Sequence, residues 1–232
     1  MSTPPFSYSA QFLASIERTV SKERLGRYLK ATNQDWVKAV ELYEYNVALS
    51  EMLFGYLHGL EVAVRNAMHQ ALTNGYNTPH WYDHAPIGSY LHDKFVKKAK
   101  QEAGPGAPAG KVVAELSFGF WTALTSHQHN WSLWKPYVRL AFPNATVPRQ
   151  NIHRRLETIR YLRNRIAHHE PILTSRSTMY AGYKDQRDIT LQEIGECAEW
   201  VCRDTARWLE TQFRYHQAAA ILAHVSAMTV TL

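Results

Sequence analysis

A long apolar pattern between residues 34 and 72 limits most strongly which fold this chain can adopt. This stretch contains no proline, and its apolar side chains recur largely at three- and four-residue spacing: Val37, Val40, Leu49, Leu53, Leu57, Leu60, Val64, Met68 and Leu72. Because a helical turn contains about 3.6 residues, these side chains form one continuous stripe. The pattern predicts one long helix, or two nearly continuous helices separated at Gly55 or Gly59.

Helical patterns also cover most of the remaining chain. They predict helices over residues 21–31, with Ser21 as the N-cap, over 91–102, 111–126 and 149–169, and from about Thr190 to the C-terminus. No alternation of polar and apolar residues persists long enough to predict a sheet. We therefore expect one all-α domain over residues 1–232, with a core at about 24–216, a flexible connector at 103–110 and a C-terminal helix at 217–232.

The composition is that of a globular protein with a substantial core. Hydrophobic residues make up 45% and charged residues 20% of the chain. No basic and then apolar leader begins the sequence, and no apolar stretch reaches the roughly 20 residues that span a membrane. We therefore expect a cytoplasmic protein without a membrane partner. A net charge of +6 and a pI near 9.3 favour a polyanionic partner, nucleic acid first.

The segment RYLRNRIAHHEPIL, which starts at Arg160, gathers groups that handle phosphates and protons. Pro171 cannot continue a helix and disfavours helical angles at the residue before it. The helix should therefore end near His168 or His169. Asn164 and His168 are four residues apart and share one face, with Arg160 one turn earlier on the same stripe.

The chemistry of these residues suits cleavage of a phosphodiester. Arg163 offers a planar, permanently charged fork of donors for phosphate oxygens, although it lies about 140° around an ideal helix from His168. A histidine can both accept and donate a proton near neutral pH, and the Asn164 amide can orient an imidazole or a substrate. Together they could promote attack of a ribose 2′-hydroxyl on the adjacent phosphate without a metal ion.

Two other interpretations remain open from the residues alone. Arginine and histidine side chains could simply cap the helix end, where the last carbonyl groups carry partial negative charge. A metal site is the second alternative, but His168 and His169 diverge on a helix because they are adjacent. The HQH at 127–129 lacks carboxylate or cysteine companions.

A second Arg-Asn pair lies in the long helix at Arg65 and Asn66, with His69 following. Glu61 precedes Arg65 by four residues, the favourable order for an ion pair on one helix. Such pairs are generally surface or packing features. Alternatively, this helix crosses the one that carries Arg163, and Glu61, Arg65 and Asn66 support the catalytic groups. A pseudo-symmetric site built from both Arg-Asn pairs is the least favoured, because His69 lies mid-helix.

Basic and aromatic side chains are further candidates for RNA contact. Arg154, Arg155 and Arg165 lie on the helix of the motif and could follow a phosphate backbone, although a solvated face is an equal alternative for the first two. Five aromatic side chains could stack bases, but the expected role of most is core packing: Trp81, Tyr82, Trp121, Trp131 and Trp134.

The motif and its flanking segments resemble those of the HEPN-domain ribonucleases. YLRNRIAHHEPI resembles their arginine-x4-histidine signature, in which a polar residue commonly follows the arginine. LSEMLFGYLHGLEVAVRNAMHQAL resembles the first core helix of the Abi-like (abortive infection) branch, and AELSFGFWTAL its central aromatic segment. The similarity extends from about residue 24 to 175 and implies an all-α, HEPN-type helical bundle with additional helices.

The resemblance also implies a function and a site. The catalytic set would be Arg163, Asn164 and His168, and the supporting side chains those of His169, Glu170, Arg160, Glu61, Arg65 and Asn66. HEPN ribonucleases often pair two motifs across a homodimer, so each chain would supply one set to a composite site.

The expected function is that of a metal-independent endoribonuclease of abortive-infection or toxin type. It would need no cofactor, bind RNA and leave a 2′,3′-cyclic phosphate. One alternative is a non-catalytic RNA-binding module. The other is a protein-binding component of a toxin–antitoxin or defence pair, in which the antitoxin could be protein or RNA.

Overall fold

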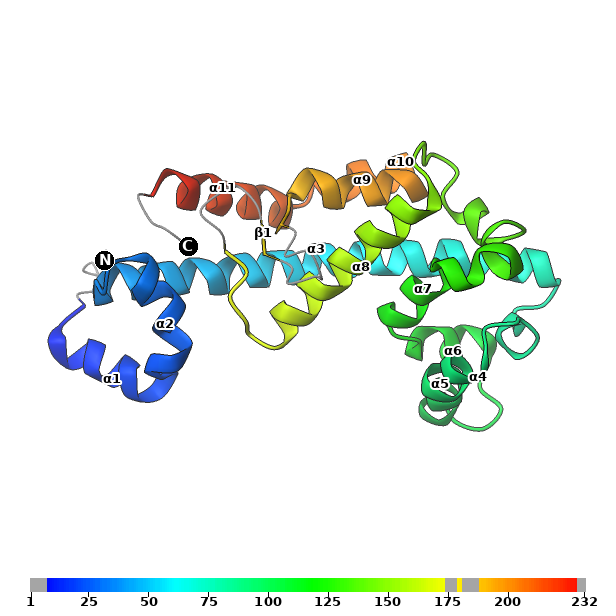
Figure 1. Cartoon of the computed structure of the whole chain (residues 1–232), viewed down its shortest axis with the longest axis horizontal. Coiled ribbons are helices and arrows are strands. Elements are labelled where there is room, and N and C mark those ends of the chain that lie inside the picture. The colour runs from blue at the N-terminus through cyan, green and yellow to red at the C-terminus, as the bar shows by residue number, and fades with distance from the viewer. Residues whose placement is uncertain (1–7, 174–178, 181–187, 229–232) are drawn as a thin grey trace.

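The helix α3 (Trp36–Tyr76) is 41 residues long and extends along most of the protein (Figure 1). The structure, a computed structural model, describes residues 8–173, 179–180 and 188–228. Asp35 caps the start of α3 by accepting a hydrogen bond from the Lys38 backbone N–H at 3.1 Å. Asn77 ends the helix in the left-handed conformation, at φ 52°. The apolar pattern over residues 34–72 therefore corresponds to one continuous helix.

Gly55 and Gly59 do not interrupt α3, because both are sites of close helix packing. A Cβ atom on Gly55 would collide with the side chain of Arg214, and one on Gly59 with Leu209. Their missing side chains let α10 (Arg203–Glu210) and α11 (Phe213–Ala227) approach α3 closely. A glycine costs a helix up to about 1 kcal/mol relative to alanine, and this packing offsets that cost.

The other elements pack around α3 in three groups (Figure 1). The first is an arm of α1 (Ala10–Val20) and α2 (Lys22–Ala31) at the N-terminal end of α3. The second contains α8 (Arg149–Ala167), which crosses α3, and α9 (Leu191–Val201), α10 and α11, which follow one another along it. Shorter helices form a lobe towards the other end of α3: η1 (Trp81–Asp83), α4 (Ser89–Leu91), the π-helix η2 (His92–Val96), α5 (Lys97–Ala103), α6 (Ala109–Glu115), α7 (Phe118–Leu124), η3 (His127–His129), the π-helix η4 (Asn130–Trp134) and η5 (Val138–Ala141).

Several predicted helix ends agree with the structure. Ser21 caps α2 by accepting a hydrogen bond from the Arg24 N–H at 3.3 Å. Thr190 begins α9 with a capping box, in which Thr190 and Glu193 satisfy each other's backbone N–H groups. The C-terminal helix predicted over 217–232 begins earlier, at Phe213, and residues 229–232 of that prediction lie outside the described residues.

One local expectation is wrong, and one short element was not predicted. The helix predicted over 111–126 is divided into α6 and α7, because Leu116 adopts an extended conformation at φ −72° and ψ 118°. Trp121 Nε1–H donates to the Leu116 carbonyl at 3.3 Å and satisfies an acceptor that the break leaves free. The described residues also contain an antiparallel pair, β1 (Met179–Tyr180) and β2 (Asp188–Ile189), too short for alternation to predict. The remaining regular structure is helical, so the all-α class is confirmed.

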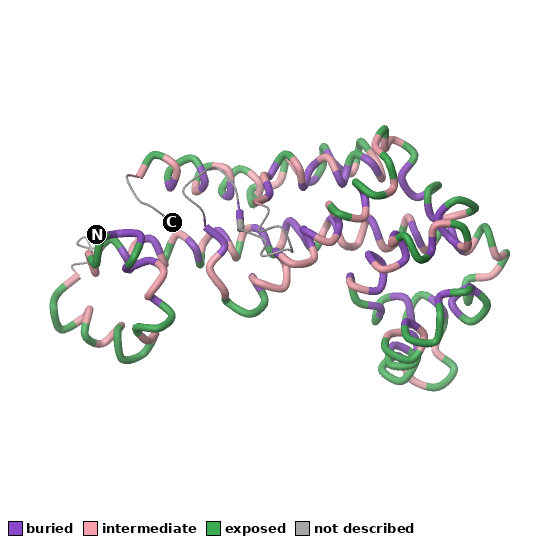
Figure 2. The backbone as a smooth tube through the Cα atoms, in the orientation of Figure 1, coloured by how far each residue is buried: buried purple, intermediate pink, exposed green. Residues whose placement is uncertain are grey.

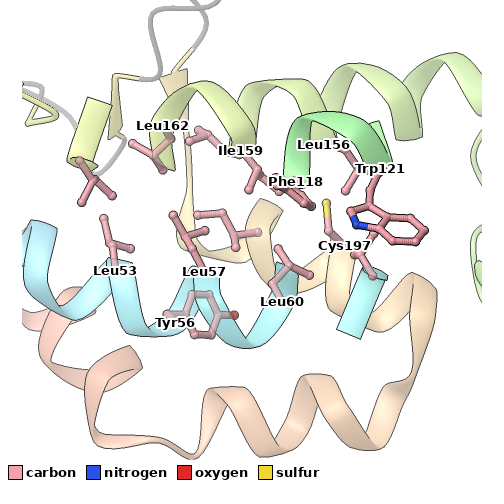
Figure 3. Packing of buried hydrophobic residues seen from close by; sticks show 14 of the residues in the cluster. Leu53, Tyr56, Leu57, Leu60, Phe118, Trp121, Leu156, Ile159, Leu162 and Cys197 are labelled. Atoms are coloured by element: carbon pink, nitrogen blue, oxygen red, sulfur yellow. The ribbon is translucent and has the colours of Figure 1, made fainter. Parts of the chain in front are cut away.

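The core that fixes the motif lies between α3, α7, α8 and α9. Figure 3 shows the side chains that meet there: Leu53, Leu57 and Leu60 of α3, Phe118 and Trp121 of α7, Leu156, Ile159 and Leu162 of α8, and Cys197 of α9. All of them are at most 2% exposed, and Figure 2 shows such buried residues along the inner faces of these helices. Burying each large aliphatic side chain stabilises the fold by about 1.5–3 kcal/mol. This packing fixes the direction in which α8 presents its C-terminal end.

By length and apolar composition alone, α3 could span a membrane, contrary to the expectation that no stretch of the sequence is sufficient. In the fold, however, α2, α8, α9 and α11 pack against it. One helix of this length and composition is weak evidence for a membrane span, because the core helix of a soluble protein passes the same test. A cytoplasmic location stays a prediction.

Candidate functional site

The C-terminal end of α8 is a fully hydrogen-bonded turn. His168 is the C-cap, and His169 follows in the left-handed conformation at φ 56°. The His169 N–H donates to the Ile166 carbonyl at 3.0 Å, and the Glu170 N–H donates to the Arg165 carbonyl at 2.9 Å. These two bonds form a Schellman motif, whose left-handed position is usually occupied by glycine. The helix therefore ends where the sequence predicts, and the turn leaves both imidazoles exposed.

Arg163 contacts α3 through Glu61. Its Nε atom lies 3.7 Å from Glu61 Oε2, and the two side chains are 38% and 22% exposed. The helix of the second Arg-Asn pair thus crosses the motif helix, as the hypothesis of a supporting role for Glu61 requires. The carboxylate lies within ion-pair distance of the guanidinium group, while more than a third of the arginine side chain stays accessible to solvent.

The side chains of Asn164 and His168 are free to contact a ligand. Neither side chain makes a hydrogen bond or ion pair in the part of the chain that the structure describes. Within those residues there is also no hydrogen bond between Arg163 and His168. One chain therefore presents these three groups at one accessible helix end without holding the cation and the imidazole together.

Arg160, one turn before Asn164, is part of a partly buried polar network with α7. Its Nε and a terminal nitrogen donate to the two carboxylate oxygens of Glu157 at 2.9 and 2.8 Å. Thr122 of α7 donates to the same carboxylate at 2.5 Å. Burial raises the pKa of Glu157, but the hydrogen bonds from Arg160 and Thr122 more than offset it, so that its pKa is lowered. The guanidinium group also lies over the Tyr161 ring, 4.5 Å from its centroid.

The same network extends one turn back to His153. The Thr125 hydroxyl donates to the Thr122 carbonyl at 2.7 Å, and its oxygen lies 2.9 Å from His153 Nδ1. Which of the two groups donates in this hydrogen bond depends on the tautomer of the His153 ring. Burial lowers the pKa of His153. These contacts join α7 to α8 and fix the stripe that leads to Asn164 and His168.

The three arginines predicted to bind RNA differ in their surroundings. Arg165 donates to the Pro171 carbonyl at 2.9 Å and pairs with Glu170 at 2.8 Å, so it stabilises the turn after α8. Arg155 is 18% exposed and pairs with Glu193 of α9 at 2.9 Å. Arg154 is exposed on the surface of α8. Only the surroundings of Arg154 leave a side chain open to a phosphate backbone, and its RNA contact stays a prediction.

The residues around the second Arg-Asn pair make contacts that stabilise the fold. Arg65 Nε donates to Asn66 Oδ1 at 3.2 Å, a contact between neighbours on the surface of α3. His69 Nδ1 accepts a hydrogen bond from the buried Trp81 Nε1–H at 3.0 Å. Burial and the nearby Arg65 charge lower the pKa of His69, so the ring is neutral. This histidine helps to pack the core, and Glu61, whose ion pair is with Arg163, is the member of the segment that contacts the motif helix.

Asn46 was not among the residues that the sequence predicts for the site. It is 4% exposed, and its Oδ1 accepts hydrogen bonds from the Ile172 and Leu173 N–H groups at 2.8 and 3.3 Å. It thereby fastens the segment after the motif to α3. The available signal was its spacing, because Asn46 falls between Leu42 and Leu49 on the buried stripe of a long helix. A polar residue at a core position requires a partner.

The remaining candidates are a metal cluster and the aromatic side chains. No three His, Cys, Asp or Glu side chains gather around a common point among the residues that the structure describes, and His129 of the HQH segment is buried. Four of the five aromatic side chains are at most 9% exposed, as core packing predicts. Trp131 is the exception at 76%, and Lys135 Nζ lies 3.3 Å from the centre of its ring.

Comparison with known proteins agrees with the resemblance seen in the sequence. A family model described as "Abi-like protein" matches residues 7–174, which include α1 to α8 and the complete motif. Neither the comparison with curated proteins nor that with solved structures gave a match. The matched region ends with the segment that Asn46 fastens to α3.

Proposed function

The chain belongs to the Abi-like protein family, which suggests a function in abortive infection, and we propose that it acts there as a metal-independent endoribonuclease. One observation supports this function above all others. Arg163, Asn164 and His168 lie at an accessible helix end, and neither Asn164 nor His168 has a partner among the described residues. Side chains that only capped the helix would be bonded to its last carbonyl groups.

In the proposed reaction a ribose 2′-oxygen attacks the adjacent phosphorus atom, and the bond to the 5′-oxygen breaks. One imidazole accepts the proton of the 2′-hydroxyl, and a second group donates a proton to the leaving 5′-oxygen. Arg163 stabilises the additional negative charge on the phosphate oxygens in the transition state. The products are a 2′,3′-cyclic phosphate and a 5′-hydroxyl.

The two proton transfers favour a composite site in a homodimer. They occur on opposite sides of the phosphorus atom and therefore need two separately placed groups. One chain offers His168 and the neighbouring His169 at a single helix end, whereas two chains would offer a His168 on each side and two copies of Arg163. In this HEPN-like arrangement, Glu61 keeps each Arg163 directed towards the shared groove. The setting we propose is the cytoplasm, with an antitoxin of protein or RNA controlling the activity.

Replacement of His168 tests the proposal. We expect His168→Ala to lower the rate of RNA cleavage by about 10²–10⁴-fold, the usual contribution of one acid–base group. Its affinity for RNA should remain within about threefold. The matched control is His127→Ala, because His127 is also exposed but lies on η3. Cleavage rates come from denaturing gels of end-labelled single-stranded RNA, with the 3′ ends identified by mass spectrometry.

Each alternative function gives a different result in the same assay. Wild-type cleavage that persists in His168→Ala contradicts the catalytic assignment. Salt-dependent binding of RNA without any cleavage identifies a non-catalytic RNA-binding module. Absence of both binding and cleavage favours a protein-binding component of a defence pair. Loss of activity in EDTA would restore the metal alternative.

A further inference from the structure

A cavity of about 800 Å³ opens beside the motif. Its walls come from the α1–α2 arm, the N-terminal half of α3 and residues 166–169 at the end of α8, and Figure 1 shows the arm and the end of α8 flanking this half of α3. Ile166, Ala167 and His169 of the motif segment line it directly. The volume lies within the range of about 300–1,000 Å³ that is usual for small-ligand sites.

A hydrogen-bond donor without a protein partner lies in the wall of this cavity. Asn46 lines it and is 4% exposed, and its Oδ1 is already used by the Ile172 and Leu173 N–H groups. The same amide's Nδ2 donates to no residue in the described part of the chain and is not one of the fully buried unpartnered atoms, so it keeps contact with solvent. Because this donor faces solvent in the cavity wall, a ligand with an acceptor atom can replace the water that it would otherwise bind.

The rest of the lining favours a flat, neutral ligand. Tyr43 and Phe54 bring aromatic rings to the wall, and Phe54 is 49% exposed. Glu51 also lines the cavity, and its carboxylate would repel a phosphate group there while it could accept a hydrogen bond from an amino group. Arg24 lies at the motif side of the cavity, where one of its terminal nitrogens donates to the His169 carbonyl at 2.6 Å.

From this arrangement we propose that the cavity binds an unpaired nucleobase of the RNA substrate, next to the phosphodiester at the end of α8. The Asn46 amide donates to an acceptor on the edge of the base, and the aromatic rings contact its face. The phosphate stays outside, near Arg163 and His168. This inference rests on the proposed ribonuclease function and adds to it that the substrate is single-stranded at the cleaved position.

A protein segment fits the lining less well than a base does. A docking helix needs a continuous apolar stripe, but Ser50 and Glu51 interrupt the apolar residues of this face of α3. An inward amide donor and aromatic rings beside a phosphate-handling motif correspond instead to the way proteins bind unstacked bases.

Two variants test the cavity with a substrate that cannot be cleaved. The probes are short single-stranded RNAs that carry one 2′-deoxy nucleotide, with each of the four bases in turn beside it. Phe54→Ala removes a half-exposed ring, so the fold should be unchanged. Asn46→Asp keeps an acceptor for the Ile172 and Leu173 N–H groups but removes the donor. The matched control is Phe213→Ala, because Phe213 is also exposed at 68% but does not line the cavity.

Fluorescence anisotropy should show binding weakened about 5- to 150-fold in Phe54→Ala, the range for loss of one stacked base. Asn46→Asp should change which of the four bases is preferred, and Phe213→Ala should bind as wild type does. Equal binding by wild type and Phe54→Ala would overturn the proposal. So would a change in oligomeric state that is confined to Phe54→Ala, since the cavity would then belong to a protein contact.

The outcomes separate this inference from the ribonuclease proposal. If wild type binds the probes through the cavity residues but cleaves no RNA, the catalytic proposal fails and the base site stands. If wild type cleaves RNA and both cavity variants bind and cleave as wild type does, the base site alone fails.

Discussion

The two Arg-Asn segments contain the same residue types, and the fold uses them differently. On α3, His69 accepts a hydrogen bond from a buried tryptophan in the middle of a helix. On α8, His168 is the exposed C-cap of its helix and has no partner among the described residues. Arg65 bonds its own neighbour, whereas Arg163 reaches a carboxylate on another helix.

The chemistry of such a segment therefore depends more on where it lies in its helix than on its composition. A mid-helix histidine such as His69, which accepts a hydrogen bond from a buried indole, becomes part of the packing, because an unbonded polar group in the core is costly. A histidine at a helix end can stay accessible, since the chain turns away and water satisfies it. The α3 segment contributes Glu61 to the site, while its histidine contributes to stability.

Apart from the loss of His168, the greatest change in cleavage rate is expected when the arginines are exchanged one at a time for alanine. Arg163→Ala should lower RNA cleavage by about 10²–10³-fold, the usual result of removing a group that stabilises transition-state charge. Arg65→Ala should change the rate by less than about threefold, because its hydrogen bond is a surface contact with Asn66. Single-turnover cleavage of one RNA by both purified variants checks this. Equal losses would mean that both segments take part in catalysis.

For the two histidines we expect the α3 segment, and not the α8 segment, to have the larger effect when the free energy of unfolding is measured. His69→Ala leaves the Trp81 Nε1–H without an acceptor in the core and should lower the free energy of unfolding by about 1–3 kcal/mol. His168→Ala removes an exposed side chain without a described partner and should change it by less than about 0.5 kcal/mol. Urea denaturation followed by tryptophan fluorescence measures both. If His168→Ala destabilised the protein as much as His69→Ala does, the His168 side chain would contribute to the stability of the fold.

The sequence predicts those features of the fold that depend on interactions between residues close together in the chain. Helical periodicity and the proline after the motif are local signals, and they predict α3 and the end of α8 correctly. The break at Leu116 is not marked by glycine or proline at that position. It is stabilised by the hydrogen bond from Trp121, whose ring is held by packing against Trp81 from a distant part of the sequence. The partner of Arg163 could be proposed only as a possibility, since Glu61 lies on another helix and its own helix offers Arg65 at the favourable spacing.

A smaller effect is expected where the two segments meet, at Glu61. Glu61→Gln keeps the shape of the side chain but removes the charge that orients Arg163, so the arginine would sample more conformations. The single-turnover cleavage rate should fall about tenfold, because small displacements of a catalytic group are costly. RNA affinity should change by less than about twofold, which separates an orienting role from a binding role. Glu115→Gln, at an exposed site on α6, is the control.

If Glu61→Gln weakened RNA affinity and left the rate of bound RNA unchanged, Glu61 would act on binding and not on orientation. If it lowered the midpoint of urea denaturation as well, the ion pair with Arg163 would be part of the packing. In that case the α8 segment, like the α3 segment, would contribute to the stability of the fold through its arginine.

The smallest expected effect concerns the residue that gives the α8 segment its sharp end. His169 has a φ of 56°, which costs a residue with a Cβ atom about 1–2 kcal/mol, whereas glycine adopts it readily. Since glycine also loses more entropy on folding, His169→Gly should raise the free energy of unfolding by a net of about 0.5–1 kcal/mol.

The matched control is Asn77→Gly, which replaces the left-handed C-cap of α3 at φ 52°. Asparagine tolerates this conformation better than histidine does, so the gain at Asn77 should be smaller. If His169→Gly stabilises the protein and keeps the wild-type cleavage rate, the imidazole that transfers the proton is that of His168. If it stabilises the protein but abolishes cleavage, the strained histidine is retained for catalysis, and the end of α8 contains two functional imidazoles where the α3 segment contains none.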